Sequence, residues 1–278
     1  MERMEQLRKR LVSEQVEGRG VRDSLVLGAM RKVPRERFVP QRLKREAYED
    51  RPLSIGAGQT ISQPYIVAFM VEALALRGGE KVLEVGGGSG YAAAVLAEIA
   101  GEVFTIERIG QLAERAAGNL ADAGYHNVHV RHADGTEGWK DQAPFDAILV
   151  SAGGPDIPKS LLHQLTVGGR MVIPVGSDPR AQELVRITRV DEDEFEQEDL
   201  ADVAGHPQLP GLVVVRDADR VGRGGHPLHD GHVGCADLAH VGRLVVHDEE
   251  VGAVGGKGGA SGLRPGCLLY TSPSPRDS

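Results

Sequence analysis

The chain has 278 residues, enough for one large domain or two small ones, each with a buried core. Its 40 Asp and Glu outnumber its 32 Lys and Arg, which gives a formal net charge of -8. A negative chain offers no basic field to attract a phosphate backbone, so we do not expect nucleic acid as a partner. The balance favours a small molecule or a peptide.

The N-terminal segment, the hydropathy and the cysteines bear on location. The first twenty residues are dense in charge and lack the apolar core of a signal peptide, and no later stretch reaches eighteen uninterrupted apolar residues. The two cysteines, Cys235 and Cys267, lie near the C-terminal end, so the rest of the chain needs no disulfide and no thiolate metal site. We expect a soluble, cytoplasmic monomer that does not contact a membrane.

The first third of the chain predicts helices, a loop and another helix. Apolar residues spaced between charges over residues 1–50 indicate two or three amphipathic helices, interrupted by glycines and prolines. Residues 50–64, DRPLSIGAGQTISQP, are rich in Gly, Ser and Pro and predict an ordered loop, a kind of segment that often carries function. An apolar helix is expected over residues 65–76.

From Lys81 onward, short apolar and β-branched strands alternate with helical patterns. This alternation predicts a mostly parallel sheet covered by helices on both faces. The expected fold class is therefore α/β, a doubly wound, Rossmann-like sandwich with an N-terminal helical segment. The expected strands are KVLEV, EVFTIE, VHVRHAD, FDAILVSA, RMVIPV and ELVRITR, and the expected helices cover residues 91–100, 109–123 and 159–165.

After about Val203 the composition changes abruptly. Residues 204–278 hold 15 of the 37 glycines, six of the ten histidines and a single aromatic residue, Tyr270. So few packing residues are typical of disorder or of a wrong reading frame, and we expect one domain over residues 1–203 followed by a largely irregular C-terminal tail. In the tail, HPLHDGH (His226–His232) could grip a transition metal in principle, but no packed element surrounds it, so we expect no metal site.

The strongest local signal is VLEVGGGSGYAA, where a strand runs into a glycine-rich turn and then into a helix. Glycine lets the backbone turn sharply and lets a ligand approach it closely, although a tight turn without a ligand is the simpler alternative. A dinucleotide fingerprint needs glycine at its first, third and sixth positions, and the sixth here is Tyr91. The GxGxG pattern of S-adenosylmethionine enzymes fits instead and assigns cofactor contacts to Gly86, Gly88, Ser89 and Gly90.

Two acidic residues follow at the ends of the next two expected strands. Glu107 lies 21 residues beyond Gly86, where a carboxylate can accept hydrogen bonds from both hydroxyls of a ribose; an exposed surface glutamate is the alternative. Asp134 is placed to bind an adenine amino group, with Gly135 permitting close approach, or else it caps a turn. Ligands of open α/β sheets bind at the carboxyl ends of the strands, so we expect S-adenosyl-L-methionine there as co-substrate.

GAGQTISQPYIVAFM, residues 56–70, resembles the signature of the protein-L-isoaspartate O-methyltransferase family. The resemblance continues through KVPRERFVP, AYEDRPLSIG, PFDAILVSAGGPDIP, LLHQLTVGGRMVIPVG and QELVRITR, and covers roughly residues 5–203. It implies a class I methyltransferase fold, with a helical lead-in and active-site loop over residues 1–75 and a cofactor-binding core over residues 76–203. The implied reaction methylates the free carboxylate of L-isoaspartyl residues in damaged proteins or peptides; the ester then collapses to a succinimide, which begins their repair.

The resemblance places the active-site residue at Ser62. From residue type alone, Ser62 or Gln63 could merely cap the helix that starts near Pro64, and both roles can coexist. Because a carboxylate is already ionised at neutral pH, no strong base is required, and positioning and exclusion of water must supply the catalysis. We therefore assign Ser62 as catalytic and Thr60, Ile61 and Gln63 to substrate binding.

Two features depart from the family pattern. Gly87 stands where the family commonly has Thr or Ser, which should loosen the turn without removing a backbone contact. After Val203 the family has a short apolar strand, whereas Ala204, Gly205 and His206 follow here, so we expect a missing edge strand and an edge prone to aggregation. Two alternatives stay open: an S-adenosylmethionine-binding protein without activity, and a small-molecule or RNA methyltransferase on the same fold.

Overall fold

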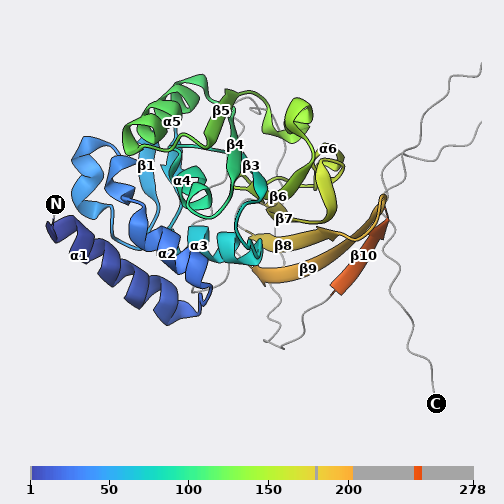
Figure 1. The fold of residues 1–278 in the computed structure, drawn as a ribbon, viewed down its shortest axis with the longest axis horizontal. Helices are drawn as coiled ribbons and strands as arrows, with labels where there is room; N and C mark the ends of the chain where they lie inside the picture. The colour runs from blue at the N-terminus through green and yellow to red at the C-terminus, as the bar shows by residue number, and fades with distance from the viewer. Residues whose placement is uncertain (1, 179–180, 203–240, 246–278) are drawn as a thin grey trace, which may run out of the picture.

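The computed structural model describes residues 2–178, 181–202 and 241–245 (Figure 1). Within these residues the chain forms an eight-stranded sheet, a separate two-stranded hairpin, and helices that pack on the larger sheet. The N-terminal part is helical, as the spacing of its apolar residues predicted. Its elements are α1 (Glu2–Leu11), a π-helical turn (Val12–Val16), α2 (Ser24–Lys32) and three 3-10 turns (Glu17–Arg19, Arg35–Arg37 and Gln41–Glu46).

The ends of α2 follow from the local sequence. The Asp23 side chain accepts hydrogen bonds from the backbone N–H groups of Leu25 and Val26, which a helix start leaves without helical partners. The helix stops at Lys32, two residues before Pro34, because the residue that precedes a proline is pushed toward extended conformations. The apolar side of α2 then packs into the core that supports the candidate site.

The segment 50–64 contains regular structure that the sequence analysis did not predict. Instead of a loop alone, β1 (Leu53–Gly56) and β2 (Gln59–Ile61) pair as an antiparallel hairpin. Their turn has positive φ at three successive residues, Gly56, Ala57 and Gly58 (92°, 50° and 71°), a conformation that favours glycine. Helix α3 (Pro64–Ala73) begins immediately after the hairpin, with proline in its first turn.

The large sheet has the order β10-β9-β8-β7-β6-β3-β4-β5. The half of the sheet that comes first along the chain is parallel, as predicted from the alternation of strands and helices, because strands that pair in parallel need long crossover connections such as helices. Strands β3 and β4 have the bounds predicted from the sequence. The parallel strands are β3 (Lys81–Val85), β4 (Glu102–Glu107), β5 (Val128–His132), β6 (Phe145–Val150) and β7 (Leu165–Asp178).

The other half of the sheet is antiparallel. Here β8 (Ala181–Arg189) pairs with β7, β9 (Glu194–Asp202) pairs with β8, and β10 (Val241–Val245) pairs with β9. The expectation of a missing edge strand was therefore wrong: residues 241–245, from the region expected to be irregular, form the edge strand. Strand β9 was not predicted from the sequence either, because its acidic composition lacks the β-branched residues that indicate a strand.

Two apolar cores lie on opposite faces of the sheet. Successive residues of a strand point to opposite faces, so Val82 and Val103 join one core while Leu83 and Phe104 join the other. The first core packs against α2, α3, α4 (Tyr91–Ala97) and α5 (Gly110–Ala123). The second is covered by the short helix α6 (Lys159–Leu162) and the segment around Trp139. No helix in the described part of the chain is long and apolar enough to span a membrane.

Candidate active site

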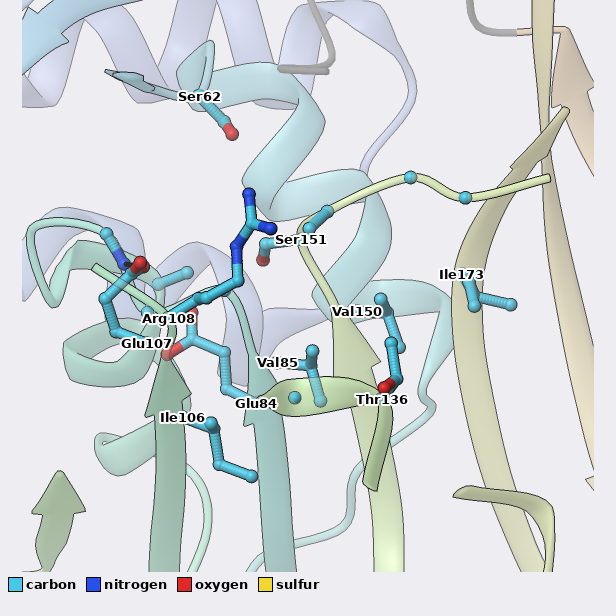
Figure 2. Close-up of a pocket in the computed structure, with 18 of the residues that line it drawn as sticks. Ser62, Glu84, Val85, Ile106, Glu107, Arg108, Thr136, Val150, Ser151 and Ile173 are labelled. Carbon is cyan, nitrogen blue, oxygen red and sulfur yellow. Dashed lines mark hydrogen bonds between the residues drawn. The ribbon is translucent and has the colours of Figure 1, made fainter. Parts of the chain in front are cut away.

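A cavity of about 540 Å³ opens at the carboxyl ends of the parallel strands. One wall comes from the hairpin and the turn into α3, residues 59–62, and the other from the segments that follow β3, β4, β5 and β6. In Figure 2, Ser62 faces the cavity from the side opposite Glu84 and Glu107. An open α/β sheet binds ligands at this edge, so the cavity lies where the sequence analysis expected a site.

The glycine-rich turn forms the floor of the cavity. Gly86 and Gly88 have φ of 93° and 55° and line it, and so does Ser89. The backbone N–H groups of Gly86 and Gly87 donate to the carbonyl of Ile106 at 2.8 and 3.1 Å, so the turn is tied to β4. Gly88 itself carries no side chain, which allows a ligand in the cavity to approach its backbone.

Gly90 has another place in the structure. It precedes α4 with φ of 88°, and a Cβ there would lie 3.1 Å from the side chain of Leu120 on α5. It does not line the cavity. Its small size therefore serves the packing of α4 on α5, and its predicted contact with a cofactor has no support from this geometry.

Glu107 is buried at the end of β4 and is not a surface glutamate. Its Oε2 accepts a hydrogen bond of 2.8 Å from the N–H of Gly88, and its Oε1 accepts one of 2.8 Å from the N–H of Ile109. These bonds fix the carboxylate against the glycine-rich turn and hold it in the lining. Each oxygen keeps a further lone pair for a ligand hydroxyl.

Asp134 caps a turn, one of the two readings that the sequence left open, and it also lies in the cavity lining. It lines the cavity, and its Oδ1 accepts hydrogen bonds from the N–H and hydroxyl of Thr136 at 2.9 and 2.8 Å. The bond from the Thr136 N–H is the main reason why the pKa of Asp134 lies below its usual value. The neighbouring Gly135 also lines the cavity, and a Cβ there would lie 2.4 Å from Cγ1 of Val85, so packing requires glycine.

The turn between β2 and α3 places three of the predicted residues in the lining: Thr60, Ile61 and Ser62. Gln63 does not line the cavity; its buried side chain turns away and donates to Asp50, at 3.0 Å to the carbonyl and 2.7 Å to Oδ2. The same geometry gives no support to the predicted substrate contact of Gln63, which instead anchors the turn.

The cap of α3 also comes from Asp50. Its Oδ1 accepts a 3.1 Å hydrogen bond from the N–H of Tyr65 in the first turn of the helix. Gln63 occupies the N-cap position without a capping bond from its side chain. Because Asp50 caps the helix, the hydroxyl of Ser62 remains available to the cavity.

Comparison with known proteins identifies the family. A family model described as Protein-L-isoaspartate(D-aspartate) O-methyltransferase (PCMT) matches residues 5–207. The chain belongs to this family. The match begins within α1 and extends past the end of β9, so both walls of the cavity lie inside the matched range.

Individual members of this methyltransferase family are similar to this chain in sequence. Protein-L-isoaspartate O-methyltransferase 1 of Rhodopseudomonas palustris (strain HaA2) is 63% identical over 202 residues, which cover 73% of this chain and 82% of the relative. Protein-L-isoaspartate O-methyltransferase 2 of Marinobacter nauticus is 56% identical over 203 residues, 73% of this chain and 93% of the relative.

Solved structures agree with the family assignment. One protein-L-isoaspartate O-methyltransferase superposes with a TM-score of 0.64 and 27% identity, over 73% of this chain and 67% of the other. A β-aspartate methyltransferase (PCMT) from Plasmodium falciparum, in complex with S-adenosyl-L-homocysteine, has a TM-score of 0.62 and 25% identity, over 70% of this chain and 95% of the other. These comparisons confirm the α/β methyltransferase fold.

Glu84 is a residue of the methyltransferase cavity that the sequence analysis missed. It is fully buried on β3, and burial raises the pKa of its carboxyl to about 7, with a smaller contribution from the nearby charge of Glu107. Its Oε2 accepts a 2.5 Å hydrogen bond from Thr105, while its Oε1 has no hydrogen-bond partner among the described residues. A glutamate within the apolar run VLEV was the signal that could have identified it.

Arg108 and Ser151 are among the other lining residues that were not predicted. Arg108 follows Glu107 directly, and Ser151 follows the end of β6. Figure 2 shows the guanidinium of Arg108 directed toward the region between Ser62 and Ser151. Arg108 adds a positive charge to a lining that otherwise carries acidic side chains.

Among the described residues, no group of three or more His, Cys, Asp or Glu is arranged to hold a metal ion. His226–His232, the one metal candidate weighed from the sequence, lies outside the described residues, as do Cys235 and Cys267.

Proposed function

We propose that the chain is a protein-L-isoaspartate (D-aspartate) O-methyltransferase, which uses S-adenosyl-L-methionine to methylate the free carboxylate of isoaspartyl residues in damaged proteins or peptides. Family membership over residues 5–207 supports this activity. The observation that carries it is the position of Ser62, whose turn faces the glycine-rich turn across a single cavity (Figure 2).

The glycine-rich side of the cavity fits S-adenosylmethionine. Oε1 of Glu84 is buried without a hydrogen-bond partner in the described chain and so lacks the donor that an amino or hydroxyl group of a ligand would supply. Gly88 leaves room beside the backbone, and Glu107 presents a fixed carboxylate to ribose hydroxyls. The carboxylate of Asp134 lies in the same lining, where it would accept a hydrogen bond from the adenine amino group. When bound, the cofactor supplies an electrophilic methyl group on a sulfonium sulfur.

The opposite wall fits the acceptor. The hydroxyl of Thr60 is buried in the lining without a partner among the described residues, and Ser62 adds a second hydroxyl two residues later. Hydroxyl donors can orient a carboxylate without protonating it. In the step, a carboxylate oxygen uses a lone pair to form the new O–CH3 bond, and the S–CH3 bonding pair stays on sulfur, which becomes a neutral thioether. No proton moves, and the chain contributes orientation and exclusion of water.

The cavity is formed by one chain, so this proposal requires no second copy and is consistent with a monomer. Its macromolecular partner is a protein or peptide that presents an isoaspartyl residue in a flexible, extended segment, since the cavity is lined in part by turns. We place the enzyme in the cytoplasm, in line with the expectation from the sequence.

The test is transfer of labelled methyl from S-adenosylmethionine to an isoaspartyl peptide and to its aspartyl twin. We expect base-labile label in the isoaspartyl peptide alone, and Ser62→Ala to lower kcat by about 10- to 100-fold, because positioning is lost. Ser54→Ala, an exposed position on the same hairpin, serves as the control and keeps full activity.

Two results would contradict the proposal. Binding of S-adenosylhomocysteine without labelling of either peptide would identify a cofactor-binding protein that has lost activity. Labelling of an RNA or a small molecule in place of the isoaspartyl peptide would identify a methyltransferase of another substrate class.

A further inference from the structure

Arg35 is a completely buried arginine that lies outside the cavity lining. Its guanidinium donates to four backbone carbonyls, all from the segment that leads into the Ser62 turn. Nη1 donates to Ala47 at 2.6 Å and Glu49 at 3.4 Å, and Nη2 donates to Arg51 at 3.2 Å and Ser62 at 2.9 Å. One side chain thus binds backbone carbonyls along residues 47–62, including the carbonyl of Ser62, the proposed catalytic residue.

Burial of this charge is costly. Removal from water lowers the pKa of Arg35 to about 10, and only the partial charges of carbonyls lie within hydrogen-bond distance of its Nη atoms in the described chain. An apolar side chain of similar size would avoid this cost but would leave these carbonyls without their donor, so the arginine is explained by the backbone geometry that it holds. A planar group with several donors, in contrast, can hold several carbonyls in a fixed geometry.

Arg35 also contacts the other wall of the cavity. Its Cζ lies 5.7 Å from the ring centroid of Tyr91, within the range of a cation–π interaction. Tyr91 lines the cavity and is the first residue of α4, directly after the glycine-rich turn. Phe38, from the segment after Arg35, packs edge-on against the same ring at 5.8 Å. The guanidinium therefore joins the turn that carries Ser62 to the turn that we assign to the cofactor.

We infer that Arg35 is a positioning residue for methyl transfer, which fixes Ser62 relative to the glycine-rich turn so that the acceptor carboxylate meets the methyl group in line. The inference rests on the proposed function. Displacement of a reacting group by about 1 Å can lower the rate on the order of 100-fold, so a residue that fixes the two walls relative to each other should affect kcat strongly.

A second anchor makes the role testable. Asp50 holds the next residue, Gln63, and the first turn of α3, and it is itself paired with Arg19 at 2.6 Å. Replacement of Arg35 removes the bond to Ser62 together with those to three carbonyls near Asp50, whereas the side chain of Asp50 still binds Gln63 and the first turn of α3. We expect the turn to keep its path and Ser62 to shift.

The experiment compares Arg35→Lys and Arg35→Met with the wild-type chain. Lysine keeps the charge but has a single ammonium in place of the planar fork, so it cannot reach all four carbonyls. Arg37→Met is the matched control, because Arg37 is exposed in the same 3-10 turn and its side chain donates to the carbonyl of Asp122 at the surface. Each variant is measured for kcat and KM on the isoaspartyl peptide, for affinity toward S-adenosylhomocysteine and for its unfolding midpoint.

For Arg35→Lys we expect kcat to fall by about 10- to 100-fold, with the affinity for S-adenosylhomocysteine unchanged. In a Ser62→Ala background most of this loss disappears, because an anchor that acts through Ser62 has nothing left to position. Arg37→Met behaves as wild type. If Arg35→Met does not fold, Arg35→Lys still carries the comparison.

The inference is overturned if Arg35→Lys lowers kcat by the same factor in the wild-type and in the Ser62→Ala background. It is also overturned if kcat falls only in proportion to the fraction of folded protein. It is also overturned if the cofactor affinity falls and kcat at saturating cofactor does not. A wild-type chain that fails to methylate the isoaspartyl peptide refutes the proposed function itself, and is thereby distinguished from these outcomes.

Discussion

The hydroxyl of Thr105 occupies the space beside Gly87 that a side chain at residue 87 would fill. A Cβ on Gly87 would lie 2.4 Å from Thr105 Oγ1, and that hydroxyl donates to Oε2 of Glu84. Thr105 lies on the neighbouring strand β4, so that strand supplies the hydroxyl next to Glu84. The turn keeps its backbone bonds, including the 2.8 Å bond from the N–H of Gly90 to the carbonyl of Gly87.

Gly87→Ala is expected to destabilise the fold by about 1 to 3 kcal/mol, because its Cβ would collide with a stiff, buried threonine. Thr105→Ala in the same chain should recover part of that loss by making room. The free energy of unfolding in urea measures both. Gly118→Ala, on α5 with nothing within 4 Å of its Cβ, is the control and should be neutral or slightly stabilising. Equal losses in the single and double variants would contradict the steric explanation.

Glu84 should make stability depend on pH. Burial raises its pKa from 4.5 to about 7 in the folded chain, so between these values the unfolded state is ionised while the folded state still holds the proton. The contribution of this group to the free energy of unfolding therefore falls as pH rises from about 4.5 to 7, by on the order of 3 kcal/mol, and is constant above.

The Glu84→Gln variant removes that dependence. We expect the free energy of unfolding of Glu84→Gln minus that of wild type, both measured without cofactor, to increase from pH 5 to pH 7.5. Glu114→Gln, exposed on α5, is the control for general charge effects. Parallel pH profiles for wild type and Glu84→Gln would show that Glu84 ionises in the folded chain as it does in the unfolded one.

Thr60→Val should separate folding from catalysis. The hydroxyl of Thr60 is buried without a partner in the described structure, so its removal costs no hydrogen bond, and the free energy of unfolding should stay equal or increase by up to about 1 kcal/mol. If the hydroxyl binds the acceptor, KM for the isoaspartyl peptide should rise by about tenfold. Peptide kinetics at saturating cofactor provide the measurement. An unchanged KM would remove Thr60 from the acceptor site.

Deletion of residues 203–278 removes β10 and uncovers β9. Five of the nine residues of β9 are acidic, and charge on an edge strand opposes pairing between chains. We expect the shortened chain to stay monomeric at pH 7 and to self-associate as the pH falls below about 5, where carboxylates become protonated. Light scattering across this range, beside the full chain, is the measurement. Self-association that is independent of pH would show that these charges do not protect the edge.

The parallel half of the sheet was predictable because its strands and helices repeat local patterns. The bounds of β3 and β4 match the predicted segments, and Glu107 and Asp134 lie in the lining because they follow such strands. Strand β9 was not predictable in this way. Its acidic sequence is extended because it pairs with β8, a contact between segments that the pattern of either one does not show.

The same distinction holds within the site. The glycine-rich turn and Ser62 could be placed from short motifs, whereas the anchors of the Ser62 turn could not. Arg35 contacts a carbonyl 27 residues away, and Asp50 contacts a side chain 13 residues away. The periodicity of apolar residues along the sequence does not indicate such pairs. They arise only when the helical segment and the hairpin fold against each other, and for that reason Gln63 was assigned to the substrate when it faces Asp50.

The cavity takes its two walls from different stretches of chain, residues 59–67 before β3 and residues 84–173 after its start. Under the proposed function the first stretch selects the acceptor and the second holds the methyl donor. The enzyme can therefore be described as a methyl-donor domain that is preceded by a separate acceptor-binding segment. A homologue could then evolve specificity for another acceptor through substitutions in the acceptor-binding segment alone, provided that it kept the contact between Arg35 and Tyr91.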